Sequence, residues 1–374
     1  MKRILFIFLI TALVGGSFTS CENGDWDFPD FEYSTVYFAY QSPIRTVVLG
    51  EDVYDTSLDN EHKVQIMATM GGVYANNNNV EIGIKVEPTL LDDLIFDKES
   101  DTDPDRPVLL MPDNYYTLSS DKIIIPQGSV IGGVTVQLTD AFFNDPLALS
   151  TNYVIPVVMT GVTNADSILS GKPLVENPKR GRTSDWDVQP KDYILYAVKY
   201  INAYDANYLR RGTDVITIDG GTATTVKREA DYVERDEVVK LTTVSLNSVA
   251  FPQSYVSKDG HDLNFRVNLT LDANQNVTAS AFETTYQVND SVTVRNISVS
   301  GDGEFVKDGD KNSWGNQDRD ALYLDYETSY EVEIKYPVSG QPDNVMQYNY
   351  KTSDILVVRD RGVKPEWFTA VVNE

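Results

Sequence analysis

The polar loop around Trp314 carries side chains suited to binding a neutral ligand. A tryptophan ring offers a flat apolar face on which a sugar can stack, and neighbouring amides and carboxylates can bond its hydroxyls. The candidate glycan-binding residues of this loop are Trp314, Asn312, Asn316, Gln317 and Asp318. The competing hypothesis is structural: Trp314 folds back and caps the end of its domain.

Catalytic signatures in the sequence are weak. Asp325 and Glu327 resemble the end of the acidic strand motif of family 18 glycosidases, but Tyr323 stands where the first aspartate is required. His62 and His261 offer little imidazole acid–base chemistry, and no Gly-x-Ser-x-Gly nucleophile motif occurs. We therefore expect no catalytic residue and no enzymatic activity, with a glycoside hydrolase as the remaining catalytic alternative.

The composition excludes several classes of partner. The 374 residues include 31 Lys and Arg against 56 Asp and Glu, which gives a formal charge of -25. Such a protein repels nucleic acid, and strongly anionic glycans are expected to be poor ligands. A single cysteine excludes a disulfide framework and a thiolate metal site. We expect no metal, no cofactor and no nucleic-acid partner.

The N-terminus is typical of an exported lipoprotein. A basic pair precedes the apolar run 4–14, which is too short to cross a bilayer. Small residues then lead to Cys21 in a pattern that resembles the lipobox of bacterial lipoproteins. We expect a signal peptide over 1–20, and an acylated Cys21 with an acidic tether over 21–33. The alternative is an ordinary secretory signal beside a coincidental cysteine.

Alternation of apolar and polar side chains dominates the rest of the chain, and no helix of ordinary length is predicted. Residues 80–86 and 263–271 alternate with period two, which is typical of half-buried strands. The predicted fold class is all-β. We expect an immunoglobulin-like β-sandwich over 34–170, a linker rich in proline and glycine over 171–191, and a lipocalin-like β-barrel over 192–374.

The run 321–336 gives the clearest strand signal in the sequence. Tyr326 and Tyr330 have one parity, whereas Asp325 and Glu327 have the other. This pattern predicts a pair of strands with one buried face and one solvent-exposed face.

Several stretches resemble a known family. Ile123–Gly128, Val134–Val136 and Asn152–Val157 are similar to the immunoglobulin-like N-terminal domain of Bacteroidetes-type surface lipoproteins of unknown function. Ala203–Gly212 and Gly303–Gly309 look like the lipocalin-like domain often paired with it. This resemblance implies an outer-membrane lipoprotein associated with starch-utilisation-type glycan import systems, and it brings no active-site residue with it.

The predicted function is that of a lipid-anchored, non-catalytic glycan-binding accessory protein of a polysaccharide-utilisation system. Its expected partners are a glycan, an outer-membrane glycan importer complex and, through the lipid, the outer membrane, with the protein facing the cell exterior. Two other functions remain open. One is an adhesin or assembly scaffold without a small ligand, and the other is a lipocalin-like carrier of a small apolar ligand, which needs a hollow barrel.

Overall fold

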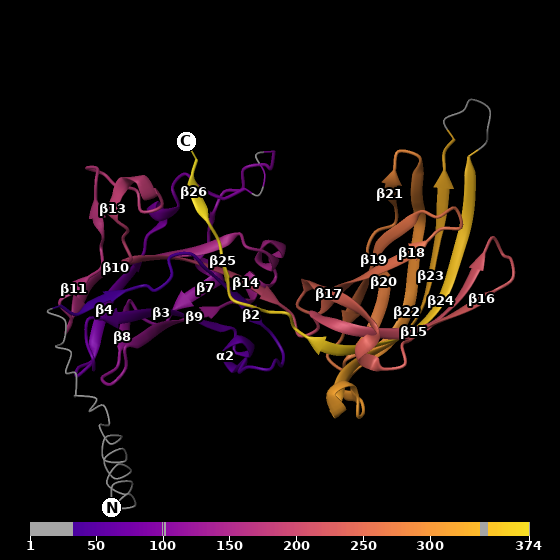
Figure 1. Ribbon diagram of the computed structural model, residues 1–374, viewed down its shortest axis with the longest axis horizontal. Helices are drawn as coiled ribbons and strands as arrows, with labels where there is room; N and C mark the ends of the chain where they lie inside the picture. Colours follow the sequence, from indigo (N-terminus) through magenta and orange to yellow (C-terminus); the bar gives the residue numbers. More distant parts are fainter. Residues whose placement is uncertain (1–32, 99, 101, 337–342, 374) are drawn as a thin grey trace, which may run out of the picture.

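The computed structural model describes residues 33–373 except 99, 101 and 337–342, and it consists of two β-rich domains placed side by side (Figure 1). The predicted all-β fold class is confirmed. The expected signal peptide, Cys21 and nearly all of the tether lie outside the described residues. Within the described part, no helix has both the length and the apolar character needed to span a membrane.

The N-terminal domain is built on one large sheet that folds over on itself. Its strand order is β11-β1-β3-β9-β8-β4-β10-β14-β2-β25, with β6 and β7 attached at the side. The hydroxyl of Tyr196 on β14 donates to the carbonyl of Gln65 on β3 at 3.0 Å, so two distant strands of the order face each other. The strands are β1 Thr35–Tyr37, β2 Pro43–Val48, β3 Lys63–Gly71, β4 Val80–Val86, β6 Leu109–Leu110, β7 Tyr116–Leu118, β8 Lys122–Ile125, β9 Ile131–Leu138, β10 Tyr153–Thr163, β11 Ser167–Ile168, β14 Tyr193–Ile201 and β25 Glu366–Trp367.

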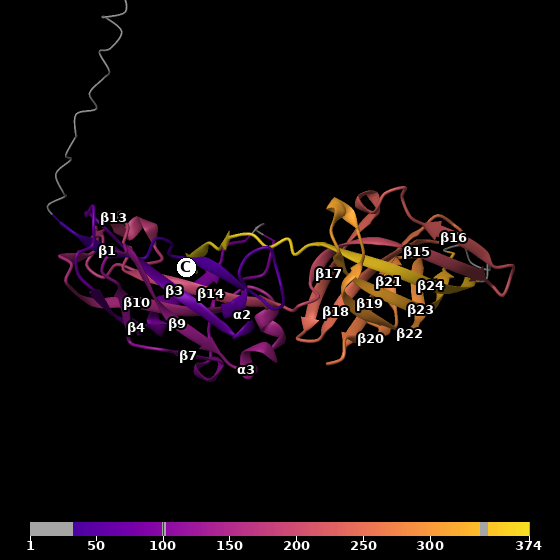
Figure 2. The same ribbon diagram turned by 90° about the horizontal axis from the view of Figure 1, so that it is seen from below.

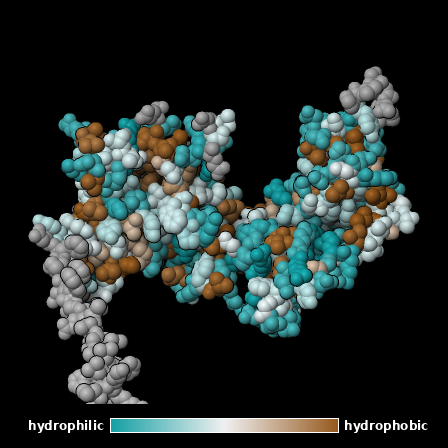
Figure 3. All heavy atoms as spheres, viewed as in Figure 1, coloured by the Kyte–Doolittle hydropathy of each residue, from teal (hydrophilic) through white to brown (hydrophobic). Residues whose placement is uncertain are grey.

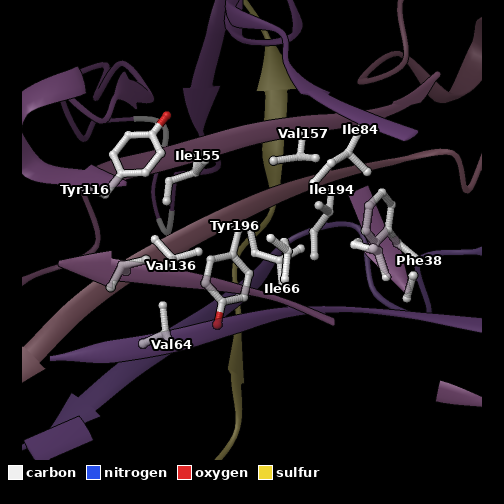
Figure 4. Packing of buried hydrophobic residues seen from close by; sticks show 14 of the residues in the cluster. Phe38, Val64, Ile66, Ile84, Tyr116, Val136, Ile155, Val157, Ile194 and Tyr196 are labelled. Carbon is white, nitrogen blue, oxygen red and sulfur yellow. The ribbon is translucent and has the colours of Figure 1, made fainter. Parts of the chain in front are cut away.

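Apolar side chains fill the space between the two halves of this sheet. Figure 4 shows Val64 and Val136 from one half pointing toward Ile155 and Tyr196 from the other. Short helices and two small sheets complete the domain around this core. They are α2 Ser57–Asn60, α3 Asp140–Phe143, η1 Pro88–Leu91, η2 Asp113–Tyr115, η3 Pro146–Leu149, η4 Thr183–Asp185, and the pairs β12 Lys172–Pro173 with β13 Trp186–Val188 and β5 Leu94–Phe96 with β26 Ala370–Val372.

Both boundaries of the second expected domain move in the structure. Strand β14 pairs with β10 and β2, and it therefore belongs to the N-terminal sheet. Its two faces are buried by different clusters, which explains its nearly continuous apolar run. At the other end, β25 pairs with β2 and β26 pairs with β5, so the end of the described chain returns to the N-terminal domain.

The expected linker over 171–191 is folded onto the N-terminal domain. It carries the β12–β13 hairpin, and the buried Trp186 donates its indole N–H to the carbonyl of Lys179 at 2.9 Å. The guanidinium of Arg180 binds the buried Asp192 through two hydrogen bonds. The proline and glycine content of this stretch thus reflects tight turns on the surface of the domain.

The second domain is a sheet closed into a ring. The strands follow the order β15-β17-β18-β19-β20-β22-β23-β24, and the ring closes because β24 also pairs with β15. On its other edge, β15 pairs with β17 over its first half and with β16 over its second half. The elements are β15 Ala206–Ile218, β16 Thr224–Arg228, η5 Val233–Arg235, β17 Glu237–Ser245, β18 Ser248–Val256, β19 Asp262–Leu271, β20 Asn276–Ala281, β21 Tyr286–Asn289, β22 Val292–Asp310, η6 Trp314–Asn316, β23 Arg319–Ile334 and β24 Asn344–Asp360.

The predicted strand pair over 321–336 is one continuous strand, β23. Residues in its middle pair in register with β24, as Thr328 does with Tyr350 and Ser329 with Asn349, so no turn interrupts it. The predicted faces are confirmed: Tyr326 and Tyr330 are buried, whereas Asp325 is exposed.

Aromatic side chains fill the ring at the level of Tyr330. The rings of Tyr330 and Tyr348 stack at 5.1 Å between centroids with an interplanar angle of 10°, and Phe265 meets Tyr330 at 5.4 Å. All three side chains are at most 2% exposed. This packing counts against the lipocalin-like carrier, because such a carrier needs open space inside the ring.

A buried ionic network occupies a second level of the ring. Arg210 and Arg228 both bind the carboxylate of Asp354, at 2.9 and 2.7 Å, and the Tyr326 hydroxyl donates to the same group at 2.9 Å. Burial raises the pKa of Asp214, but hydrogen bonds from Arg228 and Thr352 and the nearby positive charges outweigh it and lower that pKa overall.

We predict that Asp354→Ala destabilises the protein by about 3–5 kcal/mol, because it leaves the buried guanidinium of Arg210 without its buried anion. The partly buried Arg228 keeps its ion pair with Asp214. Urea unfolding followed by circular dichroism measures this change in the free energy of unfolding. The matched control is Ser353→Ala on the same strand, where the side chain is exposed and the expected effect is within about 0.5 kcal/mol. Equal midpoints for the two variants would show that the network contributes little.

Candidate ligand-binding groove at the domain junction

The two domains are joined by a buried arginine. Arg361 is 6% exposed, and its guanidinium donates to the carbonyls of Leu49 and Glu51 at 3.1 and 3.2 Å and to those of Asn202 and Asp205 at 2.5 and 2.6 Å. The first two acceptors belong to the N-terminal domain, and the other two lie where the chain enters the ring. Burial lowers the pKa of Arg361, but a guanidinium remains protonated.

The turn at which the chain enters the ring is held by its own side chains. The Asn202 amide oxygen accepts from the backbone N–H groups of Tyr204 and Asp205, each at 3.0 Å. The Asp205 carboxylate accepts from the N–H of Thr243 at 2.7 Å and pairs with Lys240 at 2.6 Å. These bonds fix the direction in which Tyr204 leaves the turn.

A groove of about 380 Å³ opens beside this turn and has aromatic rings in its wall. Tyr204 and Phe305 meet nearly edge to face, with centroids 5.3 Å apart and an interplanar angle of 75°. The Tyr204 hydroxyl donates to the Gln275 side chain at 2.9 Å, and burial raises the pKa of Tyr204. Apolar surface also comes from Ala203, Ala206 and Val358.

Charged side chains from both domains line the mouth of the groove. Lys307 of β22 pairs with Glu51 of the N-terminal domain at 2.5 Å, and their side chains are 62% and 76% exposed. The hydrogen bond to Glu51 raises the pKa of Lys307. Because an ion pair this exposed contributes at most about 1 kcal/mol, both groups can exchange partners with a ligand at little cost. Asp320 and Arg361 also line the groove.

The predicted Trp314 loop lies next to this groove, and its tryptophan is anchored. The Trp314 indole N–H donates to the carbonyl of Val358 at 3.1 Å, and the Arg319 guanidinium lies over the ring at 3.6 Å from its centroid. Val358 also lines the groove. These contacts are those expected of the capping hypothesis, and a glycan contact at Trp314 stays a prediction.

The other predicted residues are exposed and shape the loop through their backbones. The Asp318 carboxylate accepts from the N–H of Asn312 at 2.9 Å, which lowers the pKa of Asp318. The carbonyl of Gln317 accepts from the N–H of Ser313 at 2.8 Å, and Asn316 completes the turn. Asp318 lines a smaller pocket of about 220 Å³ that shares Glu51, Asp320, Val358 and Arg361 with the groove.

Asp325 and Glu327 lie elsewhere, on the outer face of the ring. Both are exposed, and Glu327 pairs with Lys351 at 2.8 Å. The general acid of a glycosidase depends on an environment that shields it from water, and these two positions lack one. The described side chains of His62 and His261 line neither the groove nor the smaller pocket beside it.

Comparisons with known proteins establish the family. A family model described as a domain of unknown function, DUF5627, matches residues 203–362, and a model of an N-terminal domain matches residues 31–166. A Bacteroides ovatus protein of unknown function has a crystal structure with a TM-score of 0.78 and 41% sequence identity; the match covers 92% of this chain and 100% of that one. The chain belongs to the same family as that Bacteroides protein.

Two further solved structures are more distant from this chain. A multidomain protein from Bacteroides ovatus that includes DUF1735 gives 14% identity and a TM-score of 0.38, with coverage of 90% and 100%. An auxiliary nutrient binding protein from Bacteroides thetaiotaomicron gives 12% identity and a TM-score of 0.36, with coverage of 87% and 95%. Scores this low carry no functional argument. A comparison with curated proteins gives no match.

Sequence reasoning missed the groove itself. Tyr204 and Phe305 both lie in the stretches that resemble the C-terminal domain of the family, but they are separated by about a hundred positions along the chain. Glu51 comes from the other domain. No local pattern indicates that three such distant residues meet, because closure of the ring and the junction contacts bring them together.

We predict that Arg361→Met destabilises the protein by about 3 kcal/mol or more, since several buried carbonyls lose their donor at once. Chemical unfolding measures the loss. Arg359→Met is the control, because Arg359 is exposed and pairs only with its neighbour Asp360; we expect a change within about 0.5 kcal/mol. Indistinguishable unfolding of the two variants would contradict a joining role for Arg361.

Proposed function

We propose that this protein is a non-catalytic accessory protein that binds a neutral glycan at the bacterial cell surface, as part of a polysaccharide-utilisation system. The observation that carries the proposal is the junction groove, in which Tyr204 and Phe305 stand beside charged side chains from both domains. Aromatic faces bind the C–H faces of sugars, and carboxylates and amines bond their hydroxyls.

The charges in the groove support a neutral ligand. Glu51 and Asp320 supply two carboxylates, and Lys307 and Arg361 supply two cations, so the groove is balanced although the whole chain carries a formal charge of -25. An anionic sugar would face the overall negative field without a local excess of positive charge. A neutral sugar avoids this penalty and can bond Glu51, Lys307 and Asp320, while the Arg361 guanidinium stays bonded to its main-chain carbonyls.

The groove also supports binding without catalysis. No histidine lines it among the described residues. Of its two carboxylates, Glu51 is paired with Lys307, and Asp320 accepts from the backbone N–H of Asp308 at 2.8 Å. The residues that resemble a glycosidase motif, Asp325 and Glu327, line a separate trough on the outer face of the ring. A bound sugar at the junction would therefore be held without a general acid and base at its glycosidic bond.

The cell-surface location is proposed from the sequence. Cys21 follows an export signal, and an acyl anchor at this residue would hold the protein on the outer membrane through the tether. A neighbouring glycan importer is the partner expected of such a protein. The adhesin or scaffold alternative predicts a stable protein partner at the cell surface and no affinity for sugars.

We predict that Phe305→Ala weakens glycan binding at least tenfold, because it removes one of the aromatic rings that line the groove; tenfold corresponds to about 1.4 kcal/mol. The protein spanning 22–374 is run in native gels that contain amylopectin, yeast mannan, xylan or laminarin, and retardation gives the affinity.

Phe282→Ala is the matched control for this experiment. Phe282 is another ring-domain phenylalanine, 37% exposed and covered by Arg266 away from the junction, so its loss is expected to leave retardation unchanged. If a polysaccharide retards the wild-type protein and Phe305→Ala equally, the groove is not the binding site. A folded wild-type protein that no polysaccharide retards would favour the scaffold alternative.

A further inference from the structure

A pair of exposed aromatic rings lies on the N-terminal domain, apart from the residues of the groove. Tyr40 is 59% exposed and Trp367 is 55% exposed. Their ring centroids are 5.6 Å apart, and their planes are inclined at 50°. The two rings come from opposite ends of the described chain, and the return of the C-terminal segment brings them together (Figures 1 and 2).

The backbone beneath these rings is fixed. Trp367 pairs with Pro43 in the β25–β2 ladder, and the N–H of Phe368 donates to the carbonyl of Ser42 at 3.1 Å. Next to Trp367, Glu366 forms an ion pair with Lys199 at 2.6 Å. On the other side of the ring pair, the N–H of Leu195 donates to the carbonyl of Gln41, next to Tyr40, at 2.7 Å. The backbone that carries both rings is thus set before any ligand arrives, which lowers the entropy cost of binding.

Folding alone does not account for the outward position of Trp367. Neighbouring residues of an extended strand point to opposite sides, and the inward neighbour Phe368 already fastens the segment by packing on Phe96 at 5.3 Å. A tryptophan stabilises a protein mainly through the area it buries, and this ring leaves more than half of its surface in water. Two such rings in contact present a preformed apolar face.

We propose that Tyr40 and Trp367 form a second carbohydrate-contacting surface, on which a sugar unit of a neutral glycan stacks. This proposal rests on the proposed function, because it assigns a further contact to the same class of ligand. Each ring offers one face to the C–H groups of a sugar, and the inclination of the rings suits units of a glycan chain that are rotated relative to each other. The Lys199–Glu366 ion pair lies on the opposite face of the β25–β2 ladder, so the surface is formed by the two rings themselves.

A glycan fits this surface better than a protein partner. A stable protein interface buries about 1,200 Å² or more in total. Two rings supply a small part of such an area. Stacking of a sugar needs only one or two rings.

The test uses the protein spanning 22–374 and the polysaccharide of the same gel series that retards the wild type. We expect Trp367→Ala and Tyr40→Ala each to weaken retardation about fivefold or more, whereas Tyr40→Phe, which keeps the ring, retains it. Tyr232→Ala is the control, because Tyr232 is 58% exposed on the ring domain. Thermal unfolding of each variant shows whether it is folded, and Tyr40→Ala leaves the β25 ladder untouched.

A second readout does not depend on substitutions. Hydroxyl-radical oxidation followed by mass spectrometry reports the exposure of each ring, and the bound polysaccharide is expected to protect Tyr40 and Trp367. The inference would be overturned if the polysaccharide changed the oxidation of neither residue and both alanine variants were retarded like the wild type. The groove would remain the binding site if Phe305→Ala still lost binding in the same experiment.

The remaining outcomes are also distinguishable. A wild-type protein that no polysaccharide retards would overturn the proposed function and this inference together. Another outcome is that a cell-surface protein cross-links to the wild-type chain but not to Trp367→Ala, while that variant binds the polysaccharide normally. This result would assign the rings to a protein interface and overturn the inference.

Discussion

The arrangement of the two domains depends on one buried guanidinium. Arg361 gives hydrogen bonds to four carbonyls, two from the N-terminal domain and two from the turn that enters the ring. Carbonyl groups buried at such a junction must be bonded, because each one left without a donor costs about 1–3 kcal/mol. A guanidinium has five donors in a rigid plane and can bond all four carbonyls at once, whereas a lysine ammonium has only three donors on a single nitrogen.

This constraint makes the groove a rigid feature of the protein. The chain crosses the junction near Asn202 on its way into the ring and again after Arg361 on its way back. Two crossings and a shared arginine oppose a hinge motion that a single linker would permit. The surface between the domains, visible at the waist of the molecule in Figure 3, is therefore already shaped for a ligand, and less binding energy is lost to ordering it.

The sequence predicts the parts of this structure that follow from local periodicity. Tyr326 points inward and Asp325 outward on β23, as their alternation indicates. Strand β14 was assigned to the wrong side of the boundary because a strand buried on both faces shows no alternation that ties it to either domain. Arg361 gives no signal at all, since its partners are main-chain carbonyls that any sequence provides.

Trp314 shows the converse difficulty. An aromatic residue among polar neighbours indicates a binding loop, but in the structure its indole N–H is bonded to the carbonyl of Val358 and Arg319 lies over its ring.

The aromatic features on the surface have a common structural origin. Phe305 meets Tyr204 because the ring closes between β24 and β15, and Trp367 meets Tyr40 because β25 returns to β2. Each pair joins residues that are distant in sequence, so neither pair forms in a partly folded chain: the first needs the closed ring, and the second needs the return of β25 to the N-terminal domain. Binding by these rings would then depend on the complete fold. A protein that is exported before it folds would acquire its affinity for sugars only after both domains have assembled at their final location.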